Sequence, residues 1–546
     1  MNPNKNFARA CALILTLASA SLYIVPFFNE PIMVDEHLII TPLKEVDSLS
    51  GLISKYKAKE IYDLQPLRDL SHLLDIKIES LTGFKQAPLF NNLILLFAIC
   101  ALIFHIAGRY LNKKKACFLV SIFLFHPLVF HIFVEYTSRK HILSFLFVLL
   151  IIKLYLGTNF QGRANKVKGS FLFVFSCLSQ PINIFLPVYT FILDLNRGKR
   201  IKEGLKNNLP LFITSFLFGI GNLYYFTFVF KEITGVSKIT FFNPGEALLS
   251  LGRYFTQIFL PLNFSMFYFQ GSVLSLIGLL LGVVLLYFTI KKLKPLHVLI
   301  TWLPLLLIFF TLNYKVTNVF LFNTYLLTPL TCLLILLGFI LKRIALKPSL
   351  MILPALLFSI SLKYSLLRAD PLNYFITSYE KEPTCQVLQS IVHYSMDEMD
   401  LNTFSSYSKE WLNRKCNYFN KKNVFLRNVI LSHMILISPE FDKQKKHRFF
   451  EEKFINERDK HILFAATEIL SKNSNSAKIT EYLAFYSSVK KKTVFVSKGT
   501  FAGKIVVNHC QKFSEIKGCE DFLAYFKRME NEKFDVKYKL KIETPR

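Results

Sequence analysis

Residues 90–111 read FNNLILLFAICALIFHIAGRYL, in which Arg109 is the only charged side chain. A helix rises about 1.5 Å per residue, so a run of about 20 apolar residues is long enough to cross the hydrocarbon core of a bilayer. Similar apolar runs recur along the chain at 10–28, 116–134, 141–157, 169–180, 182–195, 208–230, 271–290, 295–312, 324–341 and 349–367. The sequence therefore predicts an all-α polytopic membrane protein with about 11 transmembrane helices.

The composition agrees with this class of protein. The chain has 546 residues, of which 52% are hydrophobic, with 56 Phe and only two Trp. The net charge of +29 would suggest nucleic-acid binding in a soluble protein. Here much of the Lys and Arg lies in short clusters between apolar runs, which favours a role in membrane topology and no nucleic-acid partner.

The positions of the basic clusters predict the orientation. Cytoplasmic loops of membrane proteins carry an excess of Lys and Arg. Counting spans from a cytoplasmic N-terminus places six basic clusters on that side, namely Lys5 with Arg9, Arg109 with 113–115, 163–168, 197–206, 291–294, and Lys342 and Arg343 with Lys347. We expect a multi-pass protein of the cell inner membrane, with loops 29–89, 135–140, 231–270 and 313–323 and the C-terminal region outside.

The first apolar run has two interpretations. Lys5 and Arg9 before an apolar stretch with Ala18-Ser19-Ala20 are typical of a cleavable signal peptide. The run continues to Phe28, which favours a membrane span. Both interpretations place the following loop outside the cytoplasm.

The outside loops contain helix-like patterns. Apolar residues recur every three or four positions over 67–81, which predicts a helix within loop 29–89. Residues 247–262 predict an amphipathic helix lying at the membrane surface.

The chain divides by composition into a transmembrane domain, 1–367, and a polar C-terminal domain, 368–546. The second domain is predicted to be mainly helical, with helical periodicity in 385–400, 423–438, 460–472 and 476–488 that suggests degenerate helical repeats. Residues 493–496 and 536–542 are predicted to form short strands.

Four of the nine cysteines, Cys385, Cys416, Cys510 and Cys519, lie in the C-terminal domain. An even number suits two disulfides in an oxidising compartment such as the periplasm. Proximity in sequence favours pairing Cys385 with Cys416 and Cys510 with Cys519. The alternative is four free thiols in a cytosolic domain.

An acidic pair, Asp35-Glu36, follows the first apolar run. A carboxylate at the mouth of a membrane domain is a candidate proton acceptor for chemistry on a lipid-borne substrate. The alternative interpretation is that Asp35 and Glu36 are simply solvated carboxylates of a loop. Adjacent residues on a helix point about 100° apart, so Asp35 is the predicted base and Glu36 a helper.

Several motifs resemble, in order, the transmembrane and tetratricopeptide-repeat O-mannosyltransferase family. They are Val34-Asp35-Glu36, Leu64-Gln65-Pro66-Leu67-Arg68-Asp69-Leu70-Ser71, Leu74-Asp75, Leu81-Thr82-Gly83, Phe125-His126-Pro127, Ser138-Arg139-Lys140, Leu178-Ser179-Gln180-Pro181, Leu186-Pro187, Leu193-Asp194, Tyr254 and Leu260-Pro261-Leu262. The resemblance, which covers roughly residues 10–340, implies the GT-C fold. It implies an inverting glycosyltransferase that takes sugar from a polyprenyl-phosphate donor at the extracytoplasmic face.

A lipid-phosphate leaving group needs fixed cations. Arg139 and Lys140 form a basic pair in a short outside loop, and Arg can grip a phosphate bidentately. Snorkelling of both side chains at a helix end is the structural alternative. Arg68 and Arg253 are secondary candidates on the same side, and the resemblance implies that His126 shapes the donor pocket.

No cofactor is predicted. His126 and His131 are five positions apart, and with Glu135 they could suggest a metal site. That spacing does not place two imidazoles on one helix face, so a divalent metal is not indicated. No Gly-rich phosphate cradle is present, in agreement with a lipid donor.

The sequence departs from the family pattern at four places. Gln65 and Gln180 stand where Arg and Lys are usual, His141 replaces an acidic residue, and the late motif is reduced to Asn323-Thr324-Tyr325-Leu326 with Thr328-Pro329. Either the donor differs from mannose, or catalysis is lost. The sequence thus leaves two functions, a glycosyltransferase acting on a protein or glycan acceptor, and an inactive envelope scaffold or lipid-glycan transporter.

Overall fold

The computed structural model describes residues 3–29, 40, 43–44, 46–57, 65–225, 244–259, 261, 267–268, 273–295, 297–299, 301–302, 321–322, 327–381, 383, 385–397, 403, 406–407, 410, 494–497 and 537–540. The chain forms two compact units, Met1–Val387 and Leu388–Arg546. The sequence predicted a boundary at 367/368. The first unit extends further because Tyr374 and Lys381, which follow that boundary, contact His131 and Tyr364 of the helical bundle.

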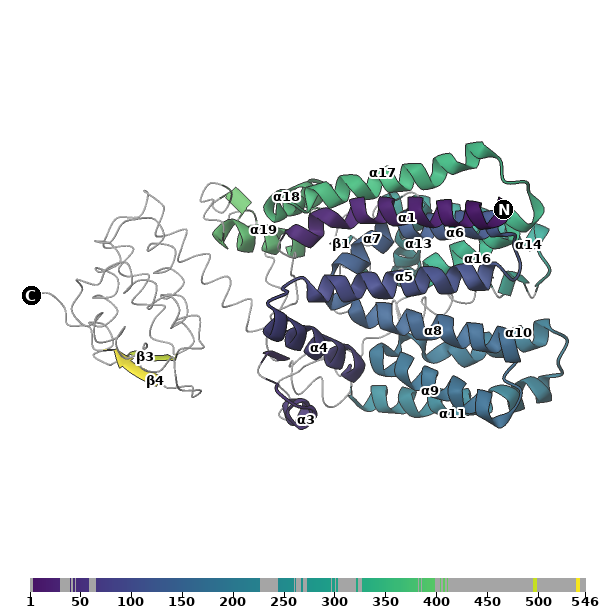
Figure 1. The fold of residues 1–546 in the computed structure, drawn as a ribbon, viewed down its shortest axis with the longest axis horizontal. Coiled ribbons are helices and arrows are strands. Elements are labelled where there is room, and N and C mark those ends of the chain that lie inside the picture. Colours follow the sequence, from purple (N-terminus) through teal and green to yellow (C-terminus); the bar gives the residue numbers. More distant parts are fainter. Residues whose placement is uncertain are drawn as a thin grey trace, which may run out of the picture. The chain divides into compact units, whose positions relative to one another are not determined.

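The first unit is a bundle of long helices (Figure 1). Their bounds are α1 Pro3–Phe28, α5 Ala87–Ala107, α6 Lys113–Phe125, α7 Pro127–Val134, α8 Arg139–Thr158, α9 Arg163–Ser179, α10 Leu186–Asn196, α11 Ile201–Tyr224, α14 Val273–Lys292, α16 Leu327–Arg343 and α17 Ile352–Leu367. Helices thus occupy every predicted apolar run except 295–312, most of which lies outside the described residues.

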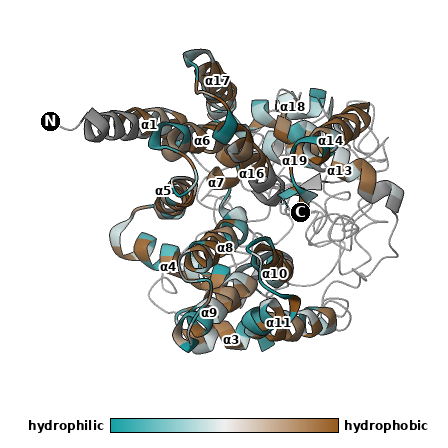
Figure 2. Cartoon of the chain, turned by 90° about the vertical axis from the view of Figure 1, so that its right-hand side faces the viewer, coloured by the Kyte–Doolittle hydropathy of each residue, from teal (hydrophilic) through white to brown (hydrophobic). Residues whose placement is uncertain are grey.

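Length and composition identify membrane spans only where the structure describes the chain. In those residues four helical segments are long and apolar enough to cross a membrane, namely Ala87–Ala107, Tyr136–Thr158, Val273–Lys292 and Pro348–Leu367, and the total of eleven stays a prediction. A fifth is added if α6 and α7 are one span bent by 57°. Figure 2 shows hydrophobic residues over most of these helices, as expected of a membrane protein.

The bend between α6 and α7 follows from local sequence. Pro127 occupies the first turn of α7, where a missing backbone N–H costs nothing. His126 precedes it in extended backbone, and its Nδ1 accepts a hydrogen bond from the Leu128 N–H at 3.2 Å. Around the bend, α5, α6, α7 and α17 bury the main apolar core.

Two helices of the first loop, α3 Leu49–Lys57 and α4 Pro66–Thr82, lie at the end of the bundle opposite the chain's N-terminus (Figure 1). The helix predicted over 67–81 is α4. It starts at Pro66 and ends before Gly83, whose φ of 72° suits glycine best. The 3-10 turns η1 Tyr136–Ser138, η2 Pro181–Phe185 and η5 Pro348–Met351 link longer helices.

Helix α13, Pro244–Phe259, corrects the prediction of a helix lying at the membrane surface. Its Arg253, Tyr254 and Ile258 are buried, and α13 packs closely against α14. Glycines permit this packing, because a Cβ added at Gly278 would lie 1.7 Å from the Gly252 carbonyl oxygen.

The remaining elements are short. Strands β1 Phe267–Tyr268 and β2 Leu321–Phe322 pair antiparallel, and α18 spans Pro371–Lys381. In the second unit, β3 Val494–Ser497 pairs antiparallel with β4 Lys537–Leu540, which confirms the two predicted strands. Helix α19, Cys385–Asp397, forms within predicted helix 385–400. The helices predicted at 423–438, 460–472 and 476–488 lie outside the described residues.

Candidate functional site

The predicted base and its helper, Asp35 and Glu36, lie outside the described residues. The site is therefore built from the described part of the same loop, helix α4, and from the helices against which it packs. These are α5, α8 and α9.

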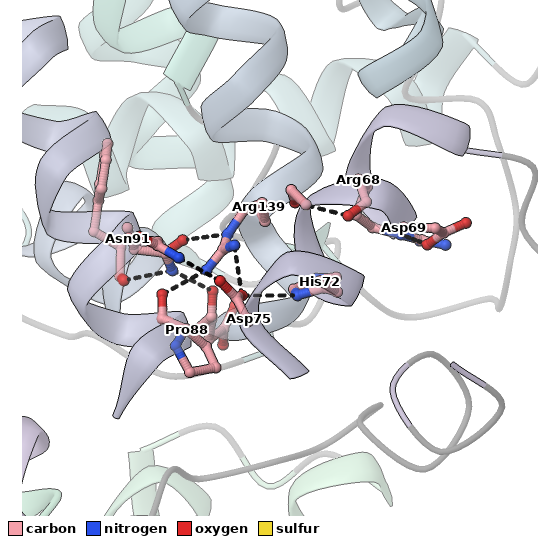
Figure 3. A network of polar contacts seen from close by, with 11 residues as sticks. Arg68, Asp69, His72, Asp75, Pro88, Asn91 and Arg139 are labelled. Carbon is pink, nitrogen blue, oxygen red and sulfur yellow. Dashed lines mark hydrogen bonds and ion pairs between the residues drawn. The ribbon is translucent and has the colours of Figure 1, made fainter. Parts of the chain in front are cut away.

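A buried ion pair joins α4 to α8. The Arg139 Nη1 donates to Asp75 Oδ2 at 2.6 Å, and both side chains are at most 2% exposed (Figure 3). Asn91 of α5 donates to the second carboxylate oxygen of Asp75. Because both charges are out of water, loss of one partner would leave the other buried and uncompensated.

Arg139 is fully engaged inside the protein. Its Nε donates to Asn92 Oδ1 at 2.7 Å and its Nη2 donates to the Pro88 carbonyl oxygen. The Asn92 amide in turn donates to the Phe133 carbonyl oxygen at 2.9 Å. In this arrangement Arg139 ties α4, α5 and α8 together, and a lipid phosphate would have to displace Asp75 to reach its guanidinium.

A second buried cluster surrounds Arg68 at the start of α4. Arg68 Nε donates to Asp69 Oδ1 at 2.6 Å, and both side chains are 0% exposed. Tyr56 of α3 donates to the other oxygen of Asp69. Arg68 Nη1 lies 3.4 Å from Gln65 Oε1, and Gln65 Nε2 donates to Gln180 Oε1 at 3.0 Å. The two glutamines that depart from the family pattern thus contact each other across a gap of 115 residues.

His72 lies between these two arginines. Its Nδ1 is 3.6 Å from Asp75 Oδ2, beyond hydrogen-bond distance, and neither ring nitrogen has a hydrogen-bond partner among the described residues. Burial lowers the pKa of His72 from 6.5 to about 4, and the charges of Arg139 and Arg68 act in the same direction. His72 is therefore neutral at pH 7.

His126 is used for packing. Its Nε2 lies 3.0 Å from the Ile258 carbonyl oxygen of α13, while its Nδ1 accepts from Leu128. An accepting Nδ1 leaves the proton on Nε2, which then donates to Ile258. Both ring nitrogens are occupied, so His126 holds α13 to the helix bend.

A further arginine, Arg368, was missed by sequence reasoning. It caps the end of α17, is 3% exposed, and stacks over the Tyr374 ring at 5.2 Å. Its Nη1 and Nη2 have no hydrogen-bond partner among the described residues. The available signal was a lone Arg directly after the apolar run 349–367.

Glu135 supplies negative charge near Arg368. Its Oε1 pairs with His131 Nε2 at 2.9 Å and its Oε2 accepts from Ser138 at 2.8 Å. Arg368 acts on Glu135 electrostatically, and the Tyr374 hydroxyl lies 3.5 Å from His131 Nδ1. No group of three or more His, Cys, Asp or Glu side chains that could hold a metal occurs in the described part of the chain.

The remaining predicted site residues have varied settings. Lys140 lies beside Arg139 in the first turn of α8 and is partly exposed. Arg253 is fully buried in α13. Cys385 is disulfide-bonded, whereas Cys416, Cys510 and Cys519 lie outside the described residues, so the predicted pairing stays a prediction.

Several sequence motifs that are far apart in the chain thus meet in the structure. Comparison with protein-family models, curated proteins and solved structures finds no match. The motif residues and their geometry are therefore the basis for a functional proposal.

Proposed function

We propose that this chain is an inverting membrane glycosyltransferase that uses a polyprenyl-phosphate sugar donor at the extracytoplasmic face of the inner membrane. The observation that carries the proposal is the meeting of two pairs of motifs, through Asp75 with Arg139 and Gln65 with Gln180, together with the contact of His126 with Ile258, which lies between Tyr254 and Leu260. Arg139 lies in the candidate span Tyr136–Thr158, and an ionisable residue within a membrane span is a functional-site hypothesis by default.

Within this proposal, Asp35 removes the proton from the acceptor hydroxyl as that oxygen attacks the sugar carbon. The carbon–oxygen bond to the phosphate breaks, and the lipid phosphate leaves with the electron pair. Asp75 and Arg139 are positioning residues, since they fix α4, and with it the later part of the loop that contains Asp35, to the bundle.

The pairing of the buried arginines supports a phosphate contact other than the predicted Arg139. Arg139 and Arg68 are each paired with an aspartate, while Arg368 has two terminal nitrogens without hydrogen-bond partners among the described residues. We assign the phosphate contact to Arg368, because a fixed guanidinium stabilises the charge that develops on the leaving group. Lys140 and His126 are secondary in this assignment.

The deciding experiment measures sugar transfer by the purified chain in liposomes, with radiolabelled polyprenyl-phosphate sugars as donors. Asp35→Asn is expected to lower kcat about 10²–10⁴-fold, the range supplied by a general base. Glu36→Gln is the matched control and should retain most activity. Undiminished transfer by Asp35→Asn would remove Asp35 from the mechanism.

The role of Arg368 is tested in the same assay. Arg368→Gln is expected to lower kcat/KM for the donor about 10²-fold, with partial recovery in Arg368→Lys. The exposed Arg200→Gln serves as control, since its side chain is 88% exposed. Equal kcat/KM values for Arg368→Gln and the control would refute the assignment.

The alternative is an inactive scaffold or lipid-glycan transporter. It is favoured by the internal pairing of Arg139 and Arg68, which leaves neither guanidinium ready for a phosphate. Saturable binding of polyprenyl-phosphate sugars without turnover, across protein and glycan acceptors, would support this alternative.

A further inference from the structure

An apolar cavity of about 340 Å³ lies in the bundle, away from α4. Its volume lies within the usual range of ligand pockets, about 300–1,000 Å³. Side chains of α5, α6, α8, α10 and α16 line it, and Leu119, Phe145 and Leu149 are among those that form its apolar walls. Figure 2 shows these helices from the end that carries the N-terminus of the chain.

Four polar lining residues lie at or beyond helix ends on one side of the bundle. Tyr110 follows α5, Asn196 ends α10, and Lys342 lies in the last turn of α16, with His297 beyond α14. These ends belong to the side of the bundle that carries the predicted cytoplasmic basic clusters. The cavity therefore combines apolar walls with a polar rim.

The rim is positively charged. The charges of Lys294, Lys342 and Arg343 act on the His297 ring, which also contacts Phe339 at 5.1 Å between ring centroids. The described lining of the cavity contains no Asp or Glu. A lysine in the last turn of a helix also interacts favourably with the helix dipole. That interaction does not account for an apolar cavity beside the lysine.

We propose that this cavity binds one acyl chain of an anionic phospholipid, whose phosphate lies at Lys342 and His297. The charge at the rim selects the occupant, because a neutral lipid would leave Lys342 without an anionic partner and a small anion would leave the apolar walls unfilled. Anionic lipids of the cytoplasmic leaflet attract basic residues near the membrane surface. The proposal does not depend on glycosyl transfer.

Gly338 offers a direct way to fill the cavity. It lines the cavity, and a Cβ added there would have no heavy atom within 4 Å. Gly338→Phe should therefore occupy the space of the acyl chain without a backbone clash. Gly221→Phe is the matched control, because Gly221 lies in α11, outside the cavity lining, and has equally open surroundings.

The experiment is native mass spectrometry of the full chain, released from nanodiscs that contain equal amounts of phosphatidylglycerol and phosphatidylcholine. The unmodified chain and Gly221→Phe are expected to retain phosphatidylglycerol, and Gly338→Phe to lose it. Lys342→Gln should lower the preference for phosphatidylglycerol about fivefold, while Lys347→Gln, an exposed lysine outside the lining, should not.

Two results would overturn the proposal. One is equal retention of phosphatidylglycerol by Gly338→Phe and Gly221→Phe, with thermal unfolding confirming that both variants are folded. The other is displacement of bound phosphatidylglycerol by an equimolar polyprenyl phosphate, which would make the polyprenyl lipid the occupant.

Discussion

Of the three aspartates that are buried among the described residues of the first unit, Asp75 and Asp194 lie near opposite ends of the helical bundle, and each accepts from several donors. Asp75 accepts from Arg139 and Asn91 where α4 meets the bundle. Asp194, near the end of α10, accepts from Tyr155, Lys199, Asn207 and Asn208. Both carboxylates are therefore compensated, as burial of a charge demands.

The two sites differ in how their cations are placed. Lys199 is five residues from Asp194 and its side chain is 23% exposed. Arg139 is 64 residues from Asp75 and is 1% exposed. The Asp194 pair fastens a local turn between neighbouring helices, whereas the Asp75 pair docks a loop helix on the bundle. A buried carboxylate paired with a cation thus stabilises a local turn at Asp194, whereas at Asp75 it positions the candidate site.

Removal of the buried cation should have the largest effect. Arg139→Met is expected to lower the free energy of unfolding by about 3–5 kcal/mol, because Asp75 stays buried without a counter-charge. Thermal unfolding in one detergent measures the loss, and limited proteolysis reports whether α4 detaches.

The double variant Asp75→Asn with Arg139→Met is the control, since it removes both charges. It should recover part of the lost stability. If the Arg139→Met variant is as stable as the unmodified chain, the ion pair of Asp75 and Arg139 does not hold α4 on the bundle. The Asp75 and Asp194 sites would then not differ in their role.

Acidification should distinguish the two ends, because His72 lies beside Asp75. The pKa of His72 is lowered to about 4 in the folded protein from 6.5. Between these two pH values the imidazole binds a proton in the unfolded chain but not in the folded chain. The free energy of unfolding is therefore highest above pH 6.5 and falls as the pH drops toward 4. We expect a loss of about 1–3 kcal/mol over this window.

The measurement is the pH dependence of thermal unfolding for the unmodified chain and for His72→Gln. The variant lacks the titrating imidazole, so its unfolding temperature should fall less between pH 6.5 and pH 4. Identical slopes for both proteins would show that His72 does not carry the effect.

The sequence predicted what depends on local pattern. Apolar runs predicted helices such as α5 and α8, the recurrence of apolar residues over 67–81 predicted α4, and the stretch 493–496 predicted β3. Each of these rests on residues that are close together in the chain.

Long-range contacts escaped prediction. The partner of Arg139 could not be foreseen, because Asp75 reaches it only after α4 docks on the bundle. Helix α13 was misjudged because its amphipathic pattern does not reveal that Gly252 and Gly278 allow close packing. Arg368 was missed because its setting depends on Tyr374, which lies beyond α17 in the chain and packs back onto the helical bundle.

The smallest effect is expected at the other cation. Lys199→Met should lower the free energy of unfolding by about 1 kcal/mol or less, because a partly exposed ion pair contributes little. Asp194 also keeps the hydroxyl of Tyr155 and the amides of Asn207 and Asn208. Thermal unfolding of Lys199→Met and Arg139→Met in the same detergent compares the two ends directly. If Lys199→Met loses as much unfolding free energy as Arg139→Met, the exposure of the cation does not decide how much each ion pair stabilises the protein. The difference between the local Asp194 pair and the Asp75 pair that docks α4 would then rest on the proteolysis of α4 alone.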